Sequence, residues 1–128
     1  MSRVVLDASA ILAVLNREPG WEKLTPDLLS DAISSTVNLA EVQAKLVEKG
    51  LTPDDAWEAA TSPVREPVDF TGEHAKLAGS LITQTRALGL SLGDRACLAV
   101  GLVLKVPVYT ADKSWKNLKI GLRIHSIR

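Results

Sequence analysis

Short apolar segments alternate along the chain with longer segments that carry apolar residues at helical spacing. The short segments predict five strands, the third of them weakened by Pro67. Their ranges are 3–7, 32–36, 64–70, 106–112 and 121–127. The longer segments predict helices over 8–18, 25–31, 37–50, 52–61, 71–89 and 91–104, with a turn or short helix over 113–118. This alternation predicts an α/β fold, a three-layer sandwich with a mainly parallel sheet.

Two of the predicted helices have unusual apolar surfaces. The segment "SLGDRACLAVGLVL" at residues 91–104 is apolar on every side after Arg95, which places it in the centre of the core. The helix at 37–50 ends before Gly50 and carries two apolar stripes. We therefore expect this second helix to contact its own sheet and also a neighbouring helix or subunit.

The composition fits one globular domain over residues 1–128, because 46% of the residues are hydrophobic and 23% are charged. The single cysteine, Cys97, allows no disulfide within the chain, which favours a reducing cytoplasm. Asp7 interrupts the first apolar run where a signal peptide needs an unbroken core, and the longest run, 96–104, is too short for a bilayer. We therefore expect a cytoplasmic protein without a membrane segment.

The net charge is zero, but its distribution is uneven. Residues 1–73 carry 13 acidic and 6 basic residues, a balance of −7, and residues 74–128 carry 2 acidic and 9 basic residues, a balance of +7. This asymmetry suits a polyanionic partner on one face, and it equally suits charges that simply alternate across a folded surface. The two acids of the basic half, Asp94 and Asp112, each open a helix or a turn.

Four carboxylates from four separate segments are expected at one end of the sheet. Asp7 ends the first predicted strand, and Asp112 ends the strand at 106–112. Asp94 opens the central helix, and Glu41 lies near the start of its own helix beside an apolar stripe. Ligands of parallel sheets bind beyond the carboxyl ends of the strands, where the amino termini of the helices also point.

Each of these acids also has an ordinary structural interpretation. Ser91 and Asp94 form the S-x-x-D pattern of a capping box. Asp7 and Asp112 suit helix or turn caps, and Glu41 suits a solvated helix surface. Taken together, four like charges at one place repel by roughly 1 kcal/mol per pair in water, and more when desolvated. A hard divalent cation, Mg²⁺ or Mn²⁺, is the natural counter-charge for such a cluster.

The motifs that carry these acids resemble a known family. They are "VVLDASAIL", "VNLAEVQAKL", "LSLGDRACLAVGLVL" and "VPVYTADKSW". In this order they are similar to the PIN-domain family and, within it, to the VapC-type toxins of bacterial toxin–antitoxin pairs. The resemblance covers nearly the whole chain. Each motif alone is a weak signal, and the combination is fairly specific.

The resemblance implies a ribonuclease that hydrolyses RNA phosphodiester bonds with Mg²⁺ or Mn²⁺. It places four metal-binding and catalytic acids at Asp7, Glu41, Asp94 and Asp112. It also places supporting hydroxyl groups at Ser9 and Thr110. The family generally forms homodimers and is neutralised by a small antitoxin whose tail enters the active-site groove, so both partners are expected here.

Several cations are candidates for RNA binding. Lys113 and Lys116 follow Asp112 closely and suit contacts with the RNA backbone, together with Lys119 and Arg123. Arg95 suits a substrate phosphate or an antitoxin carboxylate. The alternative for the lysines is a solvated basic surface, and for Arg95 a side chain packed along the core rim. His74, His125 and Trp115 are predicted to be structural, although Trp115 also suits stacking on a base.

Two rival functions remain open. The first is another Mg²⁺-dependent phosphatase or receiver-like domain, but Asp7 is followed by Ala8 and Ser9 rather than by the second acid of a D-x-D motif. The second rival is a catalytically silent PIN-like module that binds RNA or protein. The complete set of four acids argues against this silent module without proving turnover.

Overall fold

A computed structural model of the chain describes residues 3–128. Five strands form one sheet in the order β3-β2-β1-β4-β5, and every adjacent pair is parallel. The strands are β1 (Val4–Leu6), β2 (Ala32–Ser35), β3 (Glu66–Val68), β4 (Val108–Thr110) and β5 (Ile124–Ser126). All five predicted strands are therefore present, and the central pair, β1 and β4, places the ends of two acidic motifs side by side.

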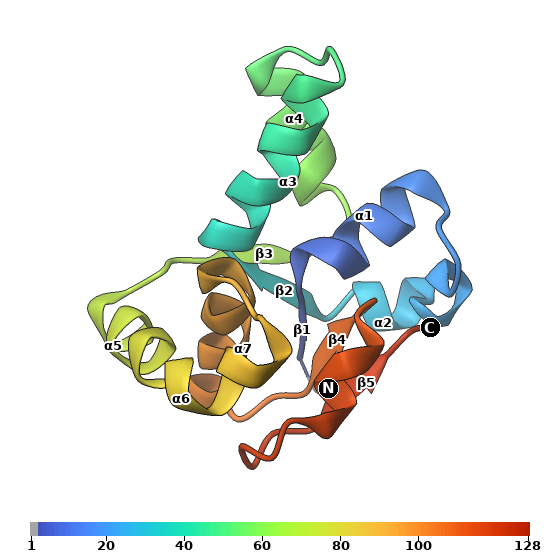
Figure 1. Cartoon of the computed structure of the whole chain (residues 1–128). Coiled ribbons are helices and arrows are strands. Elements are labelled where there is room, and N and C mark those ends of the chain that lie inside the picture. The colour runs from blue at the N-terminus through green and yellow to red at the C-terminus, as the bar shows by residue number, and fades with distance from the viewer. Residues whose placement is uncertain (1–2) are drawn as a thin grey trace.

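Seven α-helices and three short 3-10 helices connect the strands in the described chain (Figure 1). The α-helices are α1 (Ala8–Asn16), α2 (Pro26–Leu29), α3 (Thr36–Glu48), α4 (Pro53–Thr61), α5 (Gly72–Ser80), α6 (Ile82–Thr85) and α7 (Leu92–Leu104). The 3-10 helices are η1 (Trp21–Lys23), η2 (Arg86–Leu88) and η3 (Lys113–Asn117). In Figure 1, α3 and α4 form a hairpin that extends away from the sheet. No helix within residues 3–128 has the length and hydropathy to cross a bilayer.

The core has two parts, one on each face of the sheet. In β1, Val4 and Leu6 belong to one buried cluster and Val5 belongs to the other, because side chains alternate along a strand. Helices α1, α3 and α4 pack in the first cluster, and α7 packs in the second. These layers confirm the α/β sandwich. Residues 96–101 of α7 are all buried, so this helix is central as its composition predicted.

The segment at 71–89 differs from the single helix that was predicted. It forms α5, then α6, then η2. The Thr85 hydroxyl donates a hydrogen bond to the Leu81 carbonyl at 2.9 Å, and Gly79 and Ser80 precede the break. Glycine and short polar side chains weaken a helix because they favour or bond other backbone conformations. The apolar periodicity was therefore correct, but it did not reveal the interruption.

Candidate active site

Two of the acids lie at the carboxyl edge of the sheet and cap the helices that follow. Asp7 comes directly after β1, and the Ala10 backbone N–H donates to its Oδ1 at 2.8 Å. Asp112 follows β4, and the Ser114 backbone N–H donates to its Oδ1 at 2.9 Å. Because β1 and β4 are neighbouring parallel strands, both carboxylates emerge at the same edge.

The third acid, Asp94, completes the capping box at the start of α7. Its backbone N–H donates to Ser91 Oγ at 3.1 Å, and the Ser91 backbone N–H donates to Asp94 Oδ2 at 2.9 Å. The cap that the S-x-x-D pattern predicted is therefore present. The cap uses only Oδ2 of the carboxylate, so Asp94 Oδ1 is left to contact another group.

The fourth acid, Glu41, is held by a close fit between α3 and α7. Asn38, which is 1% exposed, donates from Nδ2 to Glu41 Oε1 at 2.9 Å and to the Gly93 carbonyl at 3.0 Å. A Cβ atom at position 93 would overlap the Glu41 carboxylate. Glycine at 93 and the amide of Asn38 together fix where this carboxylate lies, so it is not the solvated helix residue that its position alone suggested.

All four carboxylates line one cavity of about 220 Å³, the acidic cavity. Ser9, Lys45 and Trp115 also line it. The sequence placed the four acids in four separate segments, and the fold brings them around this single cavity. In water-poor surroundings such a grouping is costly without a counter-charge.

Asp7 shows this cost. It is 3% exposed, and burial raises its pKa from 3.8 to about 6. Hydrogen bonds from Thr110 Oγ1 to Oδ2 at 2.6 Å, from the Ala10 backbone, and from Ser9 Oγ to both oxygens counteract the rise. The charge of Asp94 raises the pKa further. Ser9 and Thr110 therefore both contact Asp7, although Thr110 lies beside Asp112 in the sequence.

The donor atoms suit a hard divalent cation. Within the described chain, Glu41 Oε2, Asp94 Oδ1 and Asp112 Oδ2 accept no hydrogen bond from the protein, while the other oxygen of each group is held. Oxygen ligands of this kind are those that Mg²⁺ and Mn²⁺ prefer. Among residues 3–128, no three His, Cys, Asp or Glu side chains are already grouped tightly enough to surround an ion.

The carboxylates of the acidic cavity also act on Cys97, which is buried in the core. Burial raises the pKa of the Cys97 thiol well above its usual range, and the charges of Asp7, Asp94 and Glu41 raise it further. Cys97 therefore stays protonated in the core. It acts as a small apolar side chain rather than as a nucleophile.

The family is decided by a sequence comparison. Residues 4–121 match the model of the PIN domain. The chain belongs to the PIN domain family. Within this PIN domain, the four carboxylates of the acidic cavity come from the residue after β1, from α3, from α7 and from the turn after β4, and the match spans all of these segments. A comparison with curated protein sequences found no match.

Solved structures share the fold of this PIN domain. DNA-bound VapBC from Salmonella typhimurium aligns with a TM-score of 0.76 and 18% identity, covering 100% of both chains. VapBC2 from Rickettsia felis, bound to a promoter DNA fragment, gives 0.73 and 18% over 96% of this chain and 97% of that one. VapC20 from Mycobacterium tuberculosis, a toxin that cleaves the sarcin–ricin loop, gives 0.72 and 19% over 94% and 98%. At these identities the likeness concerns the fold.

The predicted RNA-binding cations are dispersed over the PIN domain. Lys113 lines a hollow beside the acidic cavity, whereas Lys116 is exposed on η3 and does not line it. The Arg95 guanidinium packs back onto α5, where Nη1 donates to the Ala78 carbonyl at 2.9 Å. Roles of Lys116 and Arg95 toward RNA stay predictions.

The aromatic and histidine side chains take structural positions. Trp115 is 1% exposed and anchors η3 to the core, although one edge of it lines the acidic cavity. His74 caps α5 together with Thr71, and the His125 ring stacks on Tyr109. Neither histidine lines the acidic cavity.

Sequence reasoning missed two residues that contact this site. Lys45 lines the acidic cavity, and Asn38 holds Glu41. That both residues lie near Glu41 could have been inferred from the sequence, because residues three or four positions from Glu41 share its face of the helix. The role of Asn38 in holding Glu41 could not be inferred, because its second contact, with the Gly93 carbonyl, depends on how α7 packs against α3.

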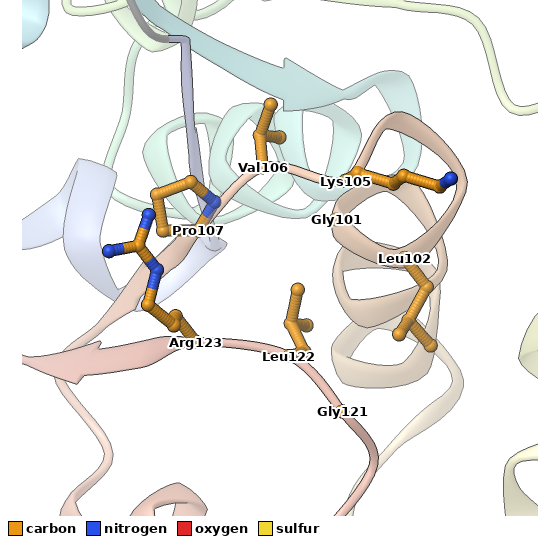
Figure 2. Close-up of a pocket in the computed structure, with 8 residues that line it drawn as sticks. All are labelled: Gly101, Leu102, Lys105, Val106, Pro107, Gly121, Leu122 and Arg123. Atoms are coloured by element: carbon orange, nitrogen blue, oxygen red, sulfur yellow. The ribbon is translucent and has the colours of Figure 1, made fainter.

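The PIN domain has another hollow at the opposite edge of the sheet. It measures about 400 Å³ and lies between the end of α7 and the segments that lead into β4 and β5 (Figure 2). Its cations, Lys105 and Arg123, point in different directions, and Leu122 projects between them. These side chains do not converge on one point, so this hollow shows no built binding site.

Proposed function

We propose that this chain is a Mg²⁺- or Mn²⁺-dependent endoribonuclease and the toxin of a toxin–antitoxin pair. The observation that carries the proposal is the acidic cavity, where four carboxylates from separate elements share about 220 Å³. Membership of the PIN domain family supports the nuclease chemistry, and the fold shared with VapBC proteins supports the toxin role. The cleavage described for VapC20 makes RNA the proposed substrate.

In this proposal Asp7 and Asp94 are the main metal ligands, and Glu41 and Asp112 complete the site. When bound, the cation lowers the pKa of a water molecule and offsets charge on the phosphate. Ser9 and Thr110 orient the Asp7 carboxylate by donating to it. Glu41, fixed by Asn38, accepts the proton of the attacking water, or Asp112 does so from the other side of the cavity.

A small antitoxin and a second copy of the chain are the proposed protein partners. Large apolar side chains are exposed on the hairpin of α3 and α4, namely Val47, Leu51 and Trp57. Each is 37–38% exposed, and we take these side chains as candidates for protein contact. The VapBC structures contain toxin with antitoxin, which supports the antitoxin as one of these partners.

The proposed metal site is tested by thermal unfolding with and without Mn²⁺. The wild type is expected to gain about 1.4 kcal/mol at ten times the dissociation constant, a shift of a few degrees. Asp94→Asn is expected to unfold at the wild-type temperature or above without metal, because one repulsive charge is gone, and to gain nothing from Mn²⁺. Cleavage of structured RNAs by the wild type alone then separates the nuclease from a silent module.

Asp55→Asn is the matched control. Asp55 occupies the same third position of α4 that Asp94 occupies in α7, and its backbone N–H donates to the capping Thr52. It lies outside the acidic cavity, so this variant should respond to Mn²⁺ as the wild type does. If no protein responds and Asp94→Asn is merely less stable, Asp94 is only a helix cap and the proposal is wrong.

The support given by Asn38 is tested separately with Asn38→Leu. Leucine has a similar size but donates no hydrogen bond, so Glu41 and the Gly93 carbonyl lose their shared donor. The dissociation constant for Mn²⁺, measured by calorimetry, is expected to rise about 10- to 100-fold, as for other outer partners of metal ligands. Unchanged affinity in a folded variant would show that the Asn38 amide does not position Glu41.

A further inference from the structure

Lys45 is the only basic residue that lines the acidic cavity within the described part of the chain. It lies on α3 four positions after Glu41, so the two side chains leave the same face of the helix one turn apart. Two other cations near the acids lie elsewhere, since Lys113 lines the hollow beside the cavity and the Arg95 guanidinium packs onto α5. Lys45 is therefore the residue that can bring positive charge to the four carboxylates.

Lys45 also lines a neighbouring hollow of about 380 Å³, which Glu18, Glu48 and Lys49 line as well. We refer to this as the Glu48 hollow. Glu48 comes three positions after Lys45 on α3, which is again a spacing at which side chains meet on a helix. Glu18 is already paired with Arg128 at 3.0 Å, whereas neither Lys45 nor Glu48 belongs to an ion pair among residues 3–128. Lys45 thus lies between the four acids of the cavity and the carboxylate of Glu48.

A lysine side chain suits movement between two such positions. Its ammonium group is a compact charge on a flexible four-carbon stem, and Lys45 is exposed. Without a metal ion, the four carboxylates around about 220 Å³ repel one another, and attraction to a nearby ammonium group offsets part of this repulsion. A divalent cation in the cavity reverses the balance, because it repels the ammonium group and neutralises the acids that attracted it. The same lysine therefore stabilises the metal-free site and opposes metal binding.

We propose that Lys45 is the internal counter-cation of the acidic cavity. Its ammonium group offsets the charge of the four carboxylates in the metal-free protein and turns to Glu48 when a divalent cation binds. The inference rests on the proposed function for the metal and adds a residue that competes with it. Lys45 is a positioning residue here, because it acts through the carboxylates and touches neither metal nor substrate. It sets the cation concentration at which the site fills.

The first test is the affinity of Lys45→Met for Mn²⁺, measured by calorimetry. Methionine keeps most of the length of the side chain and removes its charge. Repulsion between a divalent and a univalent cation about 7 Å apart in water, reduced by salt, changes an equilibrium constant about three- to sevenfold. Lys45→Met is therefore expected to bind Mn²⁺ about three- to sevenfold more tightly than the wild type. The gain should shrink at high salt, because exposed charges are screened.

Lys49→Met is the matched control. Lys49 lies one turn after Lys45 at the end of α3 and lines the Glu48 hollow, but it does not line the acidic cavity. Its replacement also removes a positive charge near the carboxyl end of the helix, so it accounts for any effect on the helix dipole. Its affinity for Mn²⁺ should stay close to that of the wild type. If Lys45→Met binds Mn²⁺ no more tightly than Lys49→Met does, the inference is wrong.

The second test is urea unfolding of the metal-free protein in the presence of a chelator. Lys45→Met is expected to be less stable than Lys49→Met, and this difference should shrink when both are made in an Asp94→Asn background. Asp94 lies on α7, so its coupling to Lys45 acts across the cavity rather than within α3. An equal difference in both backgrounds would show that Lys45 acts only within its own helix, which overturns the inference.

The two tests also separate this inference from the proposed function. A wild type that does not bind Mn²⁺ overturns the proposed metal site, whereas the unfolding comparison needs no metal. Absence of coupling between Lys45 and Asp94 in a protein that binds Mn²⁺ overturns the counter-cation alone.

Discussion

Replacing Asp7 by Asn is expected to stabilise the metal-free protein and to remove its nuclease activity. Asp7 is buried with a pKa of about 6, compared with 3.8 in an unfolded chain. At about pH 7 the ionised carboxylate therefore weakens folding by up to about 3 kcal/mol, since one pKa unit corresponds to about 1.36 kcal/mol. Asparagine keeps the shape of the side chain and carries no charge, so this cost disappears.

The pH dependence has a definite sign. The folded state holds the Asp7 proton more tightly than the unfolded state does, so this contribution to stability is fully present below about pH 4. It is lost as the pH rises through about 6. Urea unfolding from about pH 4 to 7 should show the wild type losing stability relative to Asp7→Asn. If the two free energies of unfolding run parallel across this range, the carboxylate is not buried in its charged form.

Mutating a residue that only supports a metal ligand typically lowers activity about 10- to 100-fold. Asp7 is proposed to bind the metal directly, so the activity of Asp7→Asn should fall by more than this. The measurement is RNA cleavage at saturating Mn²⁺, with Asp55→Asn as the folded control. An Asp7→Asn protein that is stable and fully active would remove Asp7 from the proposed mechanism.

Gly93→Ala is expected to abolish cleavage with little effect on folding. The added Cβ would occupy the position of the Glu41 carboxylate, which is the far end of a flexible side chain and can turn away. Alanine also favours a helix over glycine by about 1 kcal/mol, which offsets part of the disturbance. The displaced Glu41 can no longer complete the site, so both Mn²⁺ affinity and cleavage rate should fall by about 100-fold or more.

Gly101→Ala separates this effect from ordinary overpacking. Gly101 lies in the same helix, and a Cβ there would come within 2.7 Å of Val108 and 3.2 Å of Leu122. These are core side chains with little freedom, so this variant should lose about 1–3 kcal/mol of stability and keep its Mn²⁺ affinity. If Gly93→Ala also loses only stability, the glycine is needed for packing and not for the position of Glu41.

Much of the fold was predictable because strands and helices alternate and their ends are marked. Ser91 caps the helix that its S-x-x-D pattern assigned to it, and Thr25 and Thr52, the first residues of the predicted helices at 25–31 and 52–61, cap those helices. The position of Asp7 and Asp112 at one edge followed from parallel pairing of their strands. The break after α5 was not predictable from periodicity, because the spacing of apolar residues does not reveal a hydroxyl that bonds a carbonyl of its own helix, as Ser80 does with Leu77 at that point.

The candidate site was predictable in its acids but not in what surrounds them. Asp7, Glu41, Asp94 and Asp112 could be grouped from their places in the motifs. The close contact of Gly93 with Glu41, and the bridge made by Asn38, depend on how α3 packs against α7. Arg95 illustrates the same limit. It follows Asp94 in the sequence, but its guanidinium donates a hydrogen bond to the Ala78 carbonyl of α5. The packing of the helices decides which way such a side chain points.

Three of the four acids lie within the first turn, or at the cap, of a helical segment. The amino terminus of a helix carries the positive end of its macrodipole, equivalent to about half an elementary charge. The starts of α1 and α7 therefore supply fixed partial positive charge beside the carboxylates, which no metal has to provide. This backbone contribution offsets part of the repulsion among the carboxylates. It also means that a substitution that frays the first turn of α1 or α7 would weaken the cavity electrostatically, without touching any of the four acids.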